Sequence, residues 1–215
     1  MEMQSSLTGV FGDAQLITHI RRVRYSRIRI PSSRQVIVTG RNAHSINEIL
    51  REKKSWVEKK LQQLKQMEDT AAVADGQFYY FGEPAALEQF DALSAAALSR
   101  KLRSELQQQA KSFLDQHTLI QPKLAVRRMR SRLGVYSSKD DEIRLSVYLA
   151  FLPRHLIDYI VYHEFTHRDV RNHGSRFWNK MSERYPDWKQ KEKELDLWWL
   201  RAKLQAKKYT RLGKL

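Results

Sequence analysis

Cysteine is absent from the 215 residues of the sequence, so disulfides, cysteine nucleophiles and thiolate metal sites are all excluded. Any metal ion must be held by histidine or carboxylate side chains. Long apolar runs are lacking as well, because no window approaches the roughly 18 consecutive apolar residues of a membrane-spanning helix. The first residues contain neither the basic stretch nor the continuous apolar stretch of a secretion signal. We therefore expect a cytoplasmic protein with no membrane partner.

Acidic residues are few, with 24 Asp and Glu against 39 Lys and Arg, which gives a formal net charge of +15. An excess of this size bears on partners and not on fold. It favours phosphate-bearing partners such as nucleotides or nucleic acid. Hydrophobic residues make up 41% of the chain, enough for a folded core, and the length fits one domain with a small appendage.

The first 77 residues predict an N-terminal strand hairpin and helix region. After a loose lead-in over residues 1–19, apolar residues alternate with arginines over 20–30, which predicts a strand with one solvated face. A second short strand at 36–38 completes the hairpin. A helix over 45–67 opens on a capping serine with a glutamate three residues on, the spacing of a capping box. The small, polar residues that follow the helix predict a linker.

Residues 78–215 predict a second domain of mixed structure. Its expected elements are a helix over 94–114, strands over 123–130, 133–136 and 143–151, and helices over 153–170, 177–185 and 188–209. Strands and helices are partly segregated along the chain, so the predicted fold class is α+β.

The helix expected over 153–170 carries the residues that indicate chemistry, in the segment HEFTHRDVRNH. His163 and His167 are four residues apart, so they project from one flank of the helix and can bind one metal ion. Glu164 falls at the border of the apolar stripe, where an ionised carboxylate is costly unless a cation and a bound water compensate it. In this arrangement a glutamate can accept a proton from metal-bound water.

His173 is the candidate for a third ligand. It lies six residues beyond His167, so the chain must leave the helix and fold back, and Asn172 suits a left-handed conformation there. Three protein ligands with an open fourth position are typical of catalytic zinc. We predict one Zn²⁺ per chain, although iron, manganese, nickel and cobalt are compatible with these residue types. A helix with two unrelated surface histidines would explain neither His173 nor the apolar flank.

The chain resembles the YgjP-like metallopeptidase family, and more distantly the Wss-type and SprT-like proteases. The stretches that carry the resemblance are RRVRYSRIRI, VIVTG, REKKSWVEKKL, RRMRSRLGVYSS, LPRHLIDYIVYHEFTH, RNHGSRFW and YPDW. The resemblance implies a zincin-like metallopeptidase domain, in which a small β-sheet packs on the HExxH helix. It also implies that His163, His167 and His173 are the zinc ligands and that Glu164 is the catalytic base.

The chain departs from the family's usual SRWGSCS segment, because Leu133 replaces a tryptophan and Val135-Tyr136 replaces a Ser-Cys pair. None of these changes touches a proposed ligand or the base. If the segment lines the substrate site, the changes alter specificity.

Arginines precede this segment, and Arg128, Arg130 and Arg132 would share one face of a strand. They either form a solvated sheet face or bind a carboxylate or phosphate of the substrate. The resemblance favours Arg130, Ser131 and Arg132 as substrate-binding residues near the site.

The leading hypothesis is a zinc metallopeptidase, in which a zinc-bound water attacks a peptide or protein substrate and Glu164 is the general base. Zincins hold the substrate on an edge strand, for which residues 143–151 are the candidate. One alternative is a nucleotide pyrophosphatase that hydrolyses a phosphoanhydride on the same zinc site, an activity attached to proteins of this family. The other is a DNA-associated protease or nucleic-acid-binding module, which the charge and the more distant similarities suggest.

Overall fold

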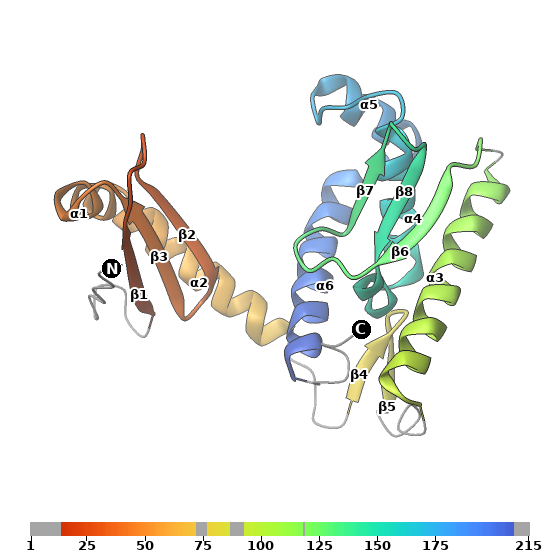
Figure 1. Cartoon of the computed structure of the whole chain (residues 1–215), viewed down its shortest axis with the longest axis horizontal. Helices are drawn as coiled ribbons and strands as arrows, with labels where there is room; N and C mark the ends of the chain where they lie inside the picture. Colours follow the sequence, from red (N-terminus) through yellow and green to blue (C-terminus); the bar gives the residue numbers. More distant parts are fainter. Residues whose placement is uncertain (1–13, 72–76, 87–92, 118, 209–215) are drawn as a thin grey trace. The chain divides into compact units, whose positions relative to one another are not determined.

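The computed structural model describes residues 14–71, 77–86, 93–117 and 119–208, and it combines helices with three small sheets (Figure 1). The predicted α+β class is confirmed. Within the described residues, no helix combines the length and the apolar character needed to cross a membrane. The chain divides into two compact units, Met1–Thr70 and Ala71–Leu215.

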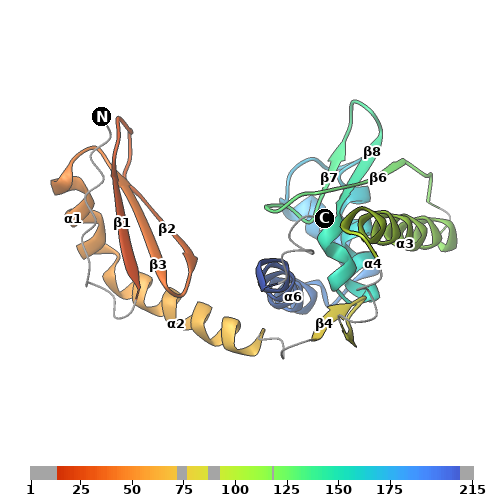
Figure 2. The ribbon, with the colours of Figure 1, turned by 60° about the horizontal axis from the view of Figure 1, so that its bottom comes forward.

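The first unit is a three-stranded sheet with two helices on one face. Its elements are β1 (Gln15–Ile20), β2 (Arg27–Ser32), β3 (Gln35–Gly40), α1 (Ala43–Glu52) and α2 (Lys54–Thr70). Strand β3 is central, with β1 parallel and β2 antiparallel to it. The two helices lie along one face of this sheet (Figure 2). The side chains of Leu16, Val36 and Val38 are buried in one cluster with apolar residues of both helices.

The predicted hairpin is confirmed as β2–β3, but other details of this unit were wrong. The lead-in contains β1, and the strand expected from Ile20 begins only at Arg27. The single predicted helix is divided at Lys53. Its N-cap is Asn42, whose side chain accepts from the Ser45 amide, and Ser45 bonds back to the Asn42 amide. The capping box therefore begins three residues earlier than the sequence suggested.

The second unit has a hairpin, a three-stranded sheet and four long helices. In chain order the elements are β4 (Gln77–Tyr80), β5 (Glu83–Ala86), α3 (Ala95–Gln116), β6 (Lys123–Arg127), β7 (Gly134–Ser137), β8 (Glu142–Ser146), the 3₁₀ helix η2 (Val147–Phe151), α4 (Arg154–Thr166), α5 (Ser175–Arg184) and α6 (Trp188–Lys208). Helix α4 lies against the β6–β8–β7 sheet and is flanked by α3, α5 and α6 (Figures 1 and 2).

The sheet differs from the prediction in two ways that bear on function. Strand β6 ends at Arg127, so Arg128, Arg130 and Arg132 lie in the loop before β7 and do not share a strand face. The strand expected over 143–151 is β8, which ends at Ser146 and lies between β6 and β7. It is therefore not an edge strand, and the prediction that it holds the substrate was wrong. The edge strand beside α4 is β7.

The apolar stripe of α4 anchors the helix in the core, as the periodicity predicted. Of the four residues that the periodicity assigns to the stripe, Ile157, Ile160 and Val161 are 3% exposed or less, as is Leu156, whereas Phe165 is only partly buried. Complete burial of an aliphatic side chain contributes about 1.5–3 kcal/mol, so this stripe fixes the rotation of the helix about its axis. The flank that carries His163 and His167 is therefore held in one orientation.

Candidate metal centre

Helix α4 places two of the predicted ligands one turn apart. The ring centroids of His163 and His167 are 5.1 Å apart, and both rings pack against Phe177 of α5, at 4.9 and 4.8 Å. Phe177 is fully buried. The buried ring of Phe177 therefore packs against both imidazoles and restricts their orientation.

A tight turn returns the chain to bring in His173. Helix α4 ends at Thr166, earlier than predicted, and the next amides bond to carbonyls three residues back, as from His167 to Glu164 at 3.2 Å. The expected left-handed Asn172 was wrong, because positive φ occurs in the described chain only at Phe81, Gly82 and Asp141. The backbone is redirected by the 3₁₀-type turn over 167–169 together with bends at Asn172 and Gly174.

The three histidines converge on one point. Nε2 of His173 lies 2.9 Å from Nε2 of His163, and the candidate ligand atoms of His163, His167 and His173 all lie within 4.8 Å of one another. Two nitrogens that each bind one zinc ion at about 2.1 Å are at most about 4.2 Å apart, so small ring rotations would close the set around an ion. The described residues supply no fourth member to this group.

The protonation of His167 suits metal binding. Its Nδ1 lies 3.0 Å from the carbonyl oxygen of Val170. A carbonyl only accepts, so Nδ1 carries the proton and Nε2 keeps its lone pair for a metal. Hydrogen bonds of this kind commonly fix the tautomer and orientation of histidine ligands.

Burial keeps His163 neutral. Burial and, to a smaller extent, the neighbouring His167 and His173 together lower the pKa of His163 to about 3. Burial also lowers the pKa of His167. Neutral imidazole is the form that binds metal, so these residues fit the metal that a catalytic site of this kind requires.

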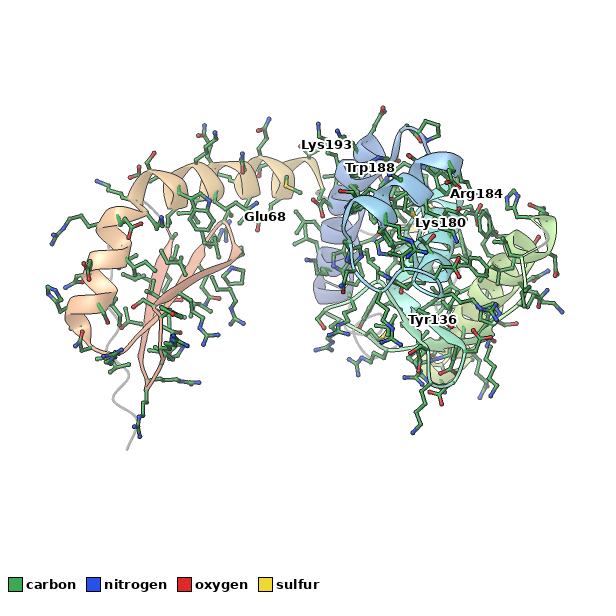
Figure 3. The ribbon with its side chains drawn as sticks, turned by 90° about the horizontal axis from the view of Figure 1, so that it is seen from above. Glu68, Tyr136, Lys180, Arg184, Trp188 and Lys193 are labelled. Atoms are coloured by element: carbon green, nitrogen blue, oxygen red, sulfur yellow. The ribbon has the colours of Figure 1, made fainter. Side chains whose placement is uncertain are left out.

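Glu164 lies beside the three histidines and is only 7% exposed. Burial raises the pKa of Glu164 to about 7, while a hydrogen bond from the backbone amide of Tyr136 and the charge of Arg132 act to lower it. Tyr136 is on the edge strand β7 and is labelled in Figure 3. The position predicted for Glu164, buried at the border of the apolar stripe, is confirmed. A carboxyl group whose pKa lies near neutral pH is suited to proton transfer.

An open cleft of about 600 Å³ gives access to this centre. Its walls come from the loop before β7, from β7 itself, from α4 and its following turn, and from α6. The lining residues are Arg132, Leu133, Gly134, Val135, Tyr136, Ser138, Tyr159, Ile160, His163, Glu164, His167, Arg171, His173, Glu192 and Leu195. A cleft of this size can admit an extended segment of chain or a small charged ligand.

Only one of the three predicted substrate-binding residues lines the cleft. Arg132 lines the cleft, whereas Arg130 and Ser131 are exposed and do not. Sequence reasoning missed Arg171, which also lines the cleft, because it lies in the turn between two ligands where no periodic pattern exists. Its position between His167 and His173 was the available signal.

The model of the YgjP-like metallopeptidase domain matches residues 88–197, just over half of the chain. The chain belongs to the YgjP-like metallopeptidase family. The predicted resemblance is therefore confirmed, and the matched residues include the whole histidine group and Glu164. Membership of this family supports a metal-dependent hydrolase.

Two solved structures are similar to this YgjP-like chain, both metallopeptidase zymogens. Abylysin of Pyrococcus abyssi is 22% identical with a TM-score of 0.37, and the alignment covers 42% of this chain and 90% of abylysin. Jannalysin of Methanocaldococcus jannaschii is also 22% identical with a TM-score of 0.37, over 43% of this chain and 92% of jannalysin. No curated protein matches the chain.

The sequence departures from other YgjP-like proteins fall in the cleft. Leu133, Val135 and Tyr136 all line it, and Tyr136 also supplies the amide that bonds Glu164. These three residues therefore lie in the same cleft as Glu164 and the histidines. The departures change none of the three predicted ligands.

Proposed function

We propose that the chain is a zinc-dependent peptidase whose activity resides in residues 78–215. His163, His167 and His173 would hold the ion, and Glu164 would be the general base. The observation that carries this proposal is the convergence of three imidazoles beside a buried carboxylate in an open cleft. A zinc ion held there would supply Lewis-acid activation of water and of the scissile carbonyl.

Glu164 has the placement that proton transfer needs. It would accept a proton from the attacking water and later donate it to the leaving amine. The Tyr136 amide orients the carboxylate, and the folded sheet excludes water from most of its surface. Arg132, at the mouth of the cleft, would attract a carboxylate of the substrate.

The edge strand β7 is suited to hold a peptide. The carbonyl of Leu133 accepts from the amide of Ser146 at 2.8 Å, toward β8, whereas the amide of Tyr136 faces the other way, toward Glu164. Backbone groups of an antiparallel strand alternate in this manner between its two neighbours. An extended substrate that pairs with the free edge of β7 would therefore lie next to Glu164.

The decisive test is Glu164→Gln. We expect this variant to keep its metal and to lose at least about 100-fold in the rate of cleavage of unstructured peptides, mapped by mass spectrometry. Glu183→Gln is the matched control, because Glu183 is exposed on α5. Equal turnover by the two variants would refute the proposal.

A second candidate is hydrolysis of a phosphoanhydride on the same metal site. The observation that favours it is that two arginines, Arg132 and Arg171, line the cleft with the histidines. One guanidinium group can donate two parallel hydrogen bonds to the oxygens of a phosphate. Release of phosphate or pyrophosphate from nucleoside triphosphates, lost in both Glu164→Gln and Arg171→Gln, would establish this activity in place of proteolysis.

A further inference from the structure

Charge is sharply segregated within the first unit. Residues 14–42 contain seven arginines, no lysine and no acidic residue, whereas residues 43–70 contain six basic and five acidic residues. All seven arginines are exposed. The sheet of this unit is therefore purely cationic, and the helices behind it are nearly balanced.

The strand topology collects five of these arginines at one end of the sheet. Strands β1 and β3 run parallel and end together, with Ile20 opposite Gly40, while the antiparallel β2 begins at the same end. The amide of Arg21 bonds the Gly40 carbonyl at 2.9 Å across this end. We call the group the arginine end, and it consists of Arg21, Arg22, Arg24, Arg27 and Arg41.

The cationic surface continues onto the open face of the sheet. Arg27 lies opposite Thr39, and Arg29 lies opposite Ile37, on the face that α1 and α2 leave uncovered (Figure 2). None of the described acidic residues forms an ion pair with Arg22, Arg24 or Arg27. These guanidinium groups are available to an outside partner.

An aromatic ring accompanies the arginine end. Tyr25 is 70% exposed, in the connection between β1 and β2, and the guanidinium of Arg24 lies over its ring at 5.2 Å from the centroid. An exposed aromatic side chain beside arginines is the combination on which unpaired nucleic acid bases stack. Burial in the protein core does not explain the position of Tyr25.

We propose that the arginine end, with Tyr25, binds single-stranded nucleic acid. The guanidinium groups contact phosphates of the backbone, and the tyrosine ring stacks on a base. An anionic membrane fits less well, because the arginine end offers no amphipathic helix and Ile20 is its one exposed aliphatic side chain. An acidic protein as the partner would account for the arginines but not for the exposed Tyr25 ring beneath Arg24.

The test uses the full-length protein and a fluorescein-labelled single strand of about 20 nucleotides, with affinity measured by anisotropy across salt concentrations. The triple variant Arg22→Gln/Arg24→Gln/Arg27→Gln should bind at least tenfold more weakly at about 50 mM salt. Each lost phosphate contact contributes about 0.7 to the slope of log Kd against log salt, so the slope should fall by about 2. Tyr25→Ala should weaken single-strand binding by about fivefold or more and leave duplex binding unchanged.

The matched control removes the same charge elsewhere in the first unit, as Arg34→Gln/Lys60→Gln/Lys65→Gln, whose side chains are exposed. It should change the affinity less than about threefold, because Arg34 lies in the β2–β3 turn at the opposite end of the sheet, where the Ser33 amide bonds Glu68 of α2. Equal losses in the two triple variants would overturn the proposal. Absence of binding at low salt would do the same, as would tighter arginine-dependent binding to phosphatidylserine vesicles or to polyglutamate. An unchanged Tyr25→Ala would overturn the assignment to single strands.

Discussion

Gly134 and Glu164 lie so close that no side chain fits between them. A Cβ at Gly134 would lie 2.7 Å from both Cγ and Oε1 of Glu164, which is nearer than real Cβ contacts come. Because Gly134 starts the edge strand β7 and Glu164 is on α4, this contact defines how the sheet and the helix meet at the proposed base. The position of the carboxylate therefore depends on the absence of a methyl group 30 residues away.

This contact predicts the effect of Gly134→Ala. The added methyl group should displace the Glu164 carboxylate and reduce kcat/KM by about tenfold or more, because small misplacements of a catalytic group are costly. Metal content should not change, since the atoms nearest to the added methyl group belong to Glu164 and not to a histidine. Steady-state kinetics and metal analysis on the same preparation check both points. Gly174→Ala is the control, because a Cβ at Gly174 would meet nothing within 4 Å; a similar loss there would contradict the account.

Trp178 packs near His173, the third proposed ligand, and its removal should weaken metal binding. Its ring lies 6.0 Å from that of His173 and stacks on Trp188, labelled in Figure 3, at 4.1 Å with an interplanar angle of 17°. Loss of a residue that orients a ligand typically costs 10–100-fold in metal affinity. We expect Trp178→Ala to raise the Kd for zinc by about tenfold, measured by competition with a chelating dye.

The control for that experiment is Trp56→Ala, because Trp56 is 52% exposed on α2 of the first unit. Its affinity for zinc should equal that of the wild type. Circular dichroism should show that both variants are folded. A Trp178→Ala protein with unchanged affinity would mean that Phe177 alone positions His173.

Metal removal should destabilise the second unit. A ligand at about 100 times its Kd stabilises the folded state by about 2.7 kcal/mol, which corresponds to about 5 °C or more in Tm for a chain of this size. A chelator should therefore lower the Tm of the wild type and leave that of His163→Ala/His167→Ala unaltered. Differential scanning calorimetry gives both values, and a chelator response in the double variant would place the metal elsewhere.

Asp158 predicts a pH dependence of stability. Burial raises the pKa of Asp158 above its usual value, although a hydrogen bond from Gln109 at 2.7 Å and the charges of His117, Arg154 and His155 oppose this. The folded state thus binds the proton more tightly than the unfolded state, so ionised Asp158 lowers the free energy of unfolding at neutral pH.

Asp158→Asn removes that cost and keeps an acceptor for Gln109. It should raise the free energy of unfolding at pH 7 by about 1 kcal/mol or less. The gain should vanish as the pH falls below the usual range of an aspartate, where the wild-type carboxyl is protonated in both states. Urea unfolding across pH checks the sign, and a gain that grows toward low pH would contradict it.

The sequence was sufficient for features that depend on local periodicity. The spacing of His163 and His167 within an apolar helical pattern predicted α4, its buried stripe and the border position of Glu164. His173 could be named from its distance along the chain, although the turn that returns it has no left-handed residue. A 3₁₀ turn uses ordinary backbone angles, so it leaves no mark in residue type.

Features that depend on pairing between distant segments could not be predicted. The sequence predicted an irregular lead-in where the structure has strand β1. Ile17 makes the outward face of β1 partly apolar, which obscures the alternation, and its partner strand β3 lies 20 residues away. The order β6–β8–β7 follows from a parallel crossover, so nothing local marks β8 as central. The Gly134–Glu164 contact and the arginine end arise in the same way, from strands that meet only in the folded chain.

The central claim is that three histidines of one chain hold a catalytic metal ion. Mass spectrometry of the metal content of untagged protein tests it most directly, with His173→Ala as the variant and His155→Ala, which pairs with Glu194 at 3.0 Å, as the control. The account predicts about one zinc ion per chain in the wild type and in the control, and a clear reduction in His173→Ala. A wild-type protein that takes up no metal after reconstitution, or a His173→Ala protein with full occupancy, would contradict it.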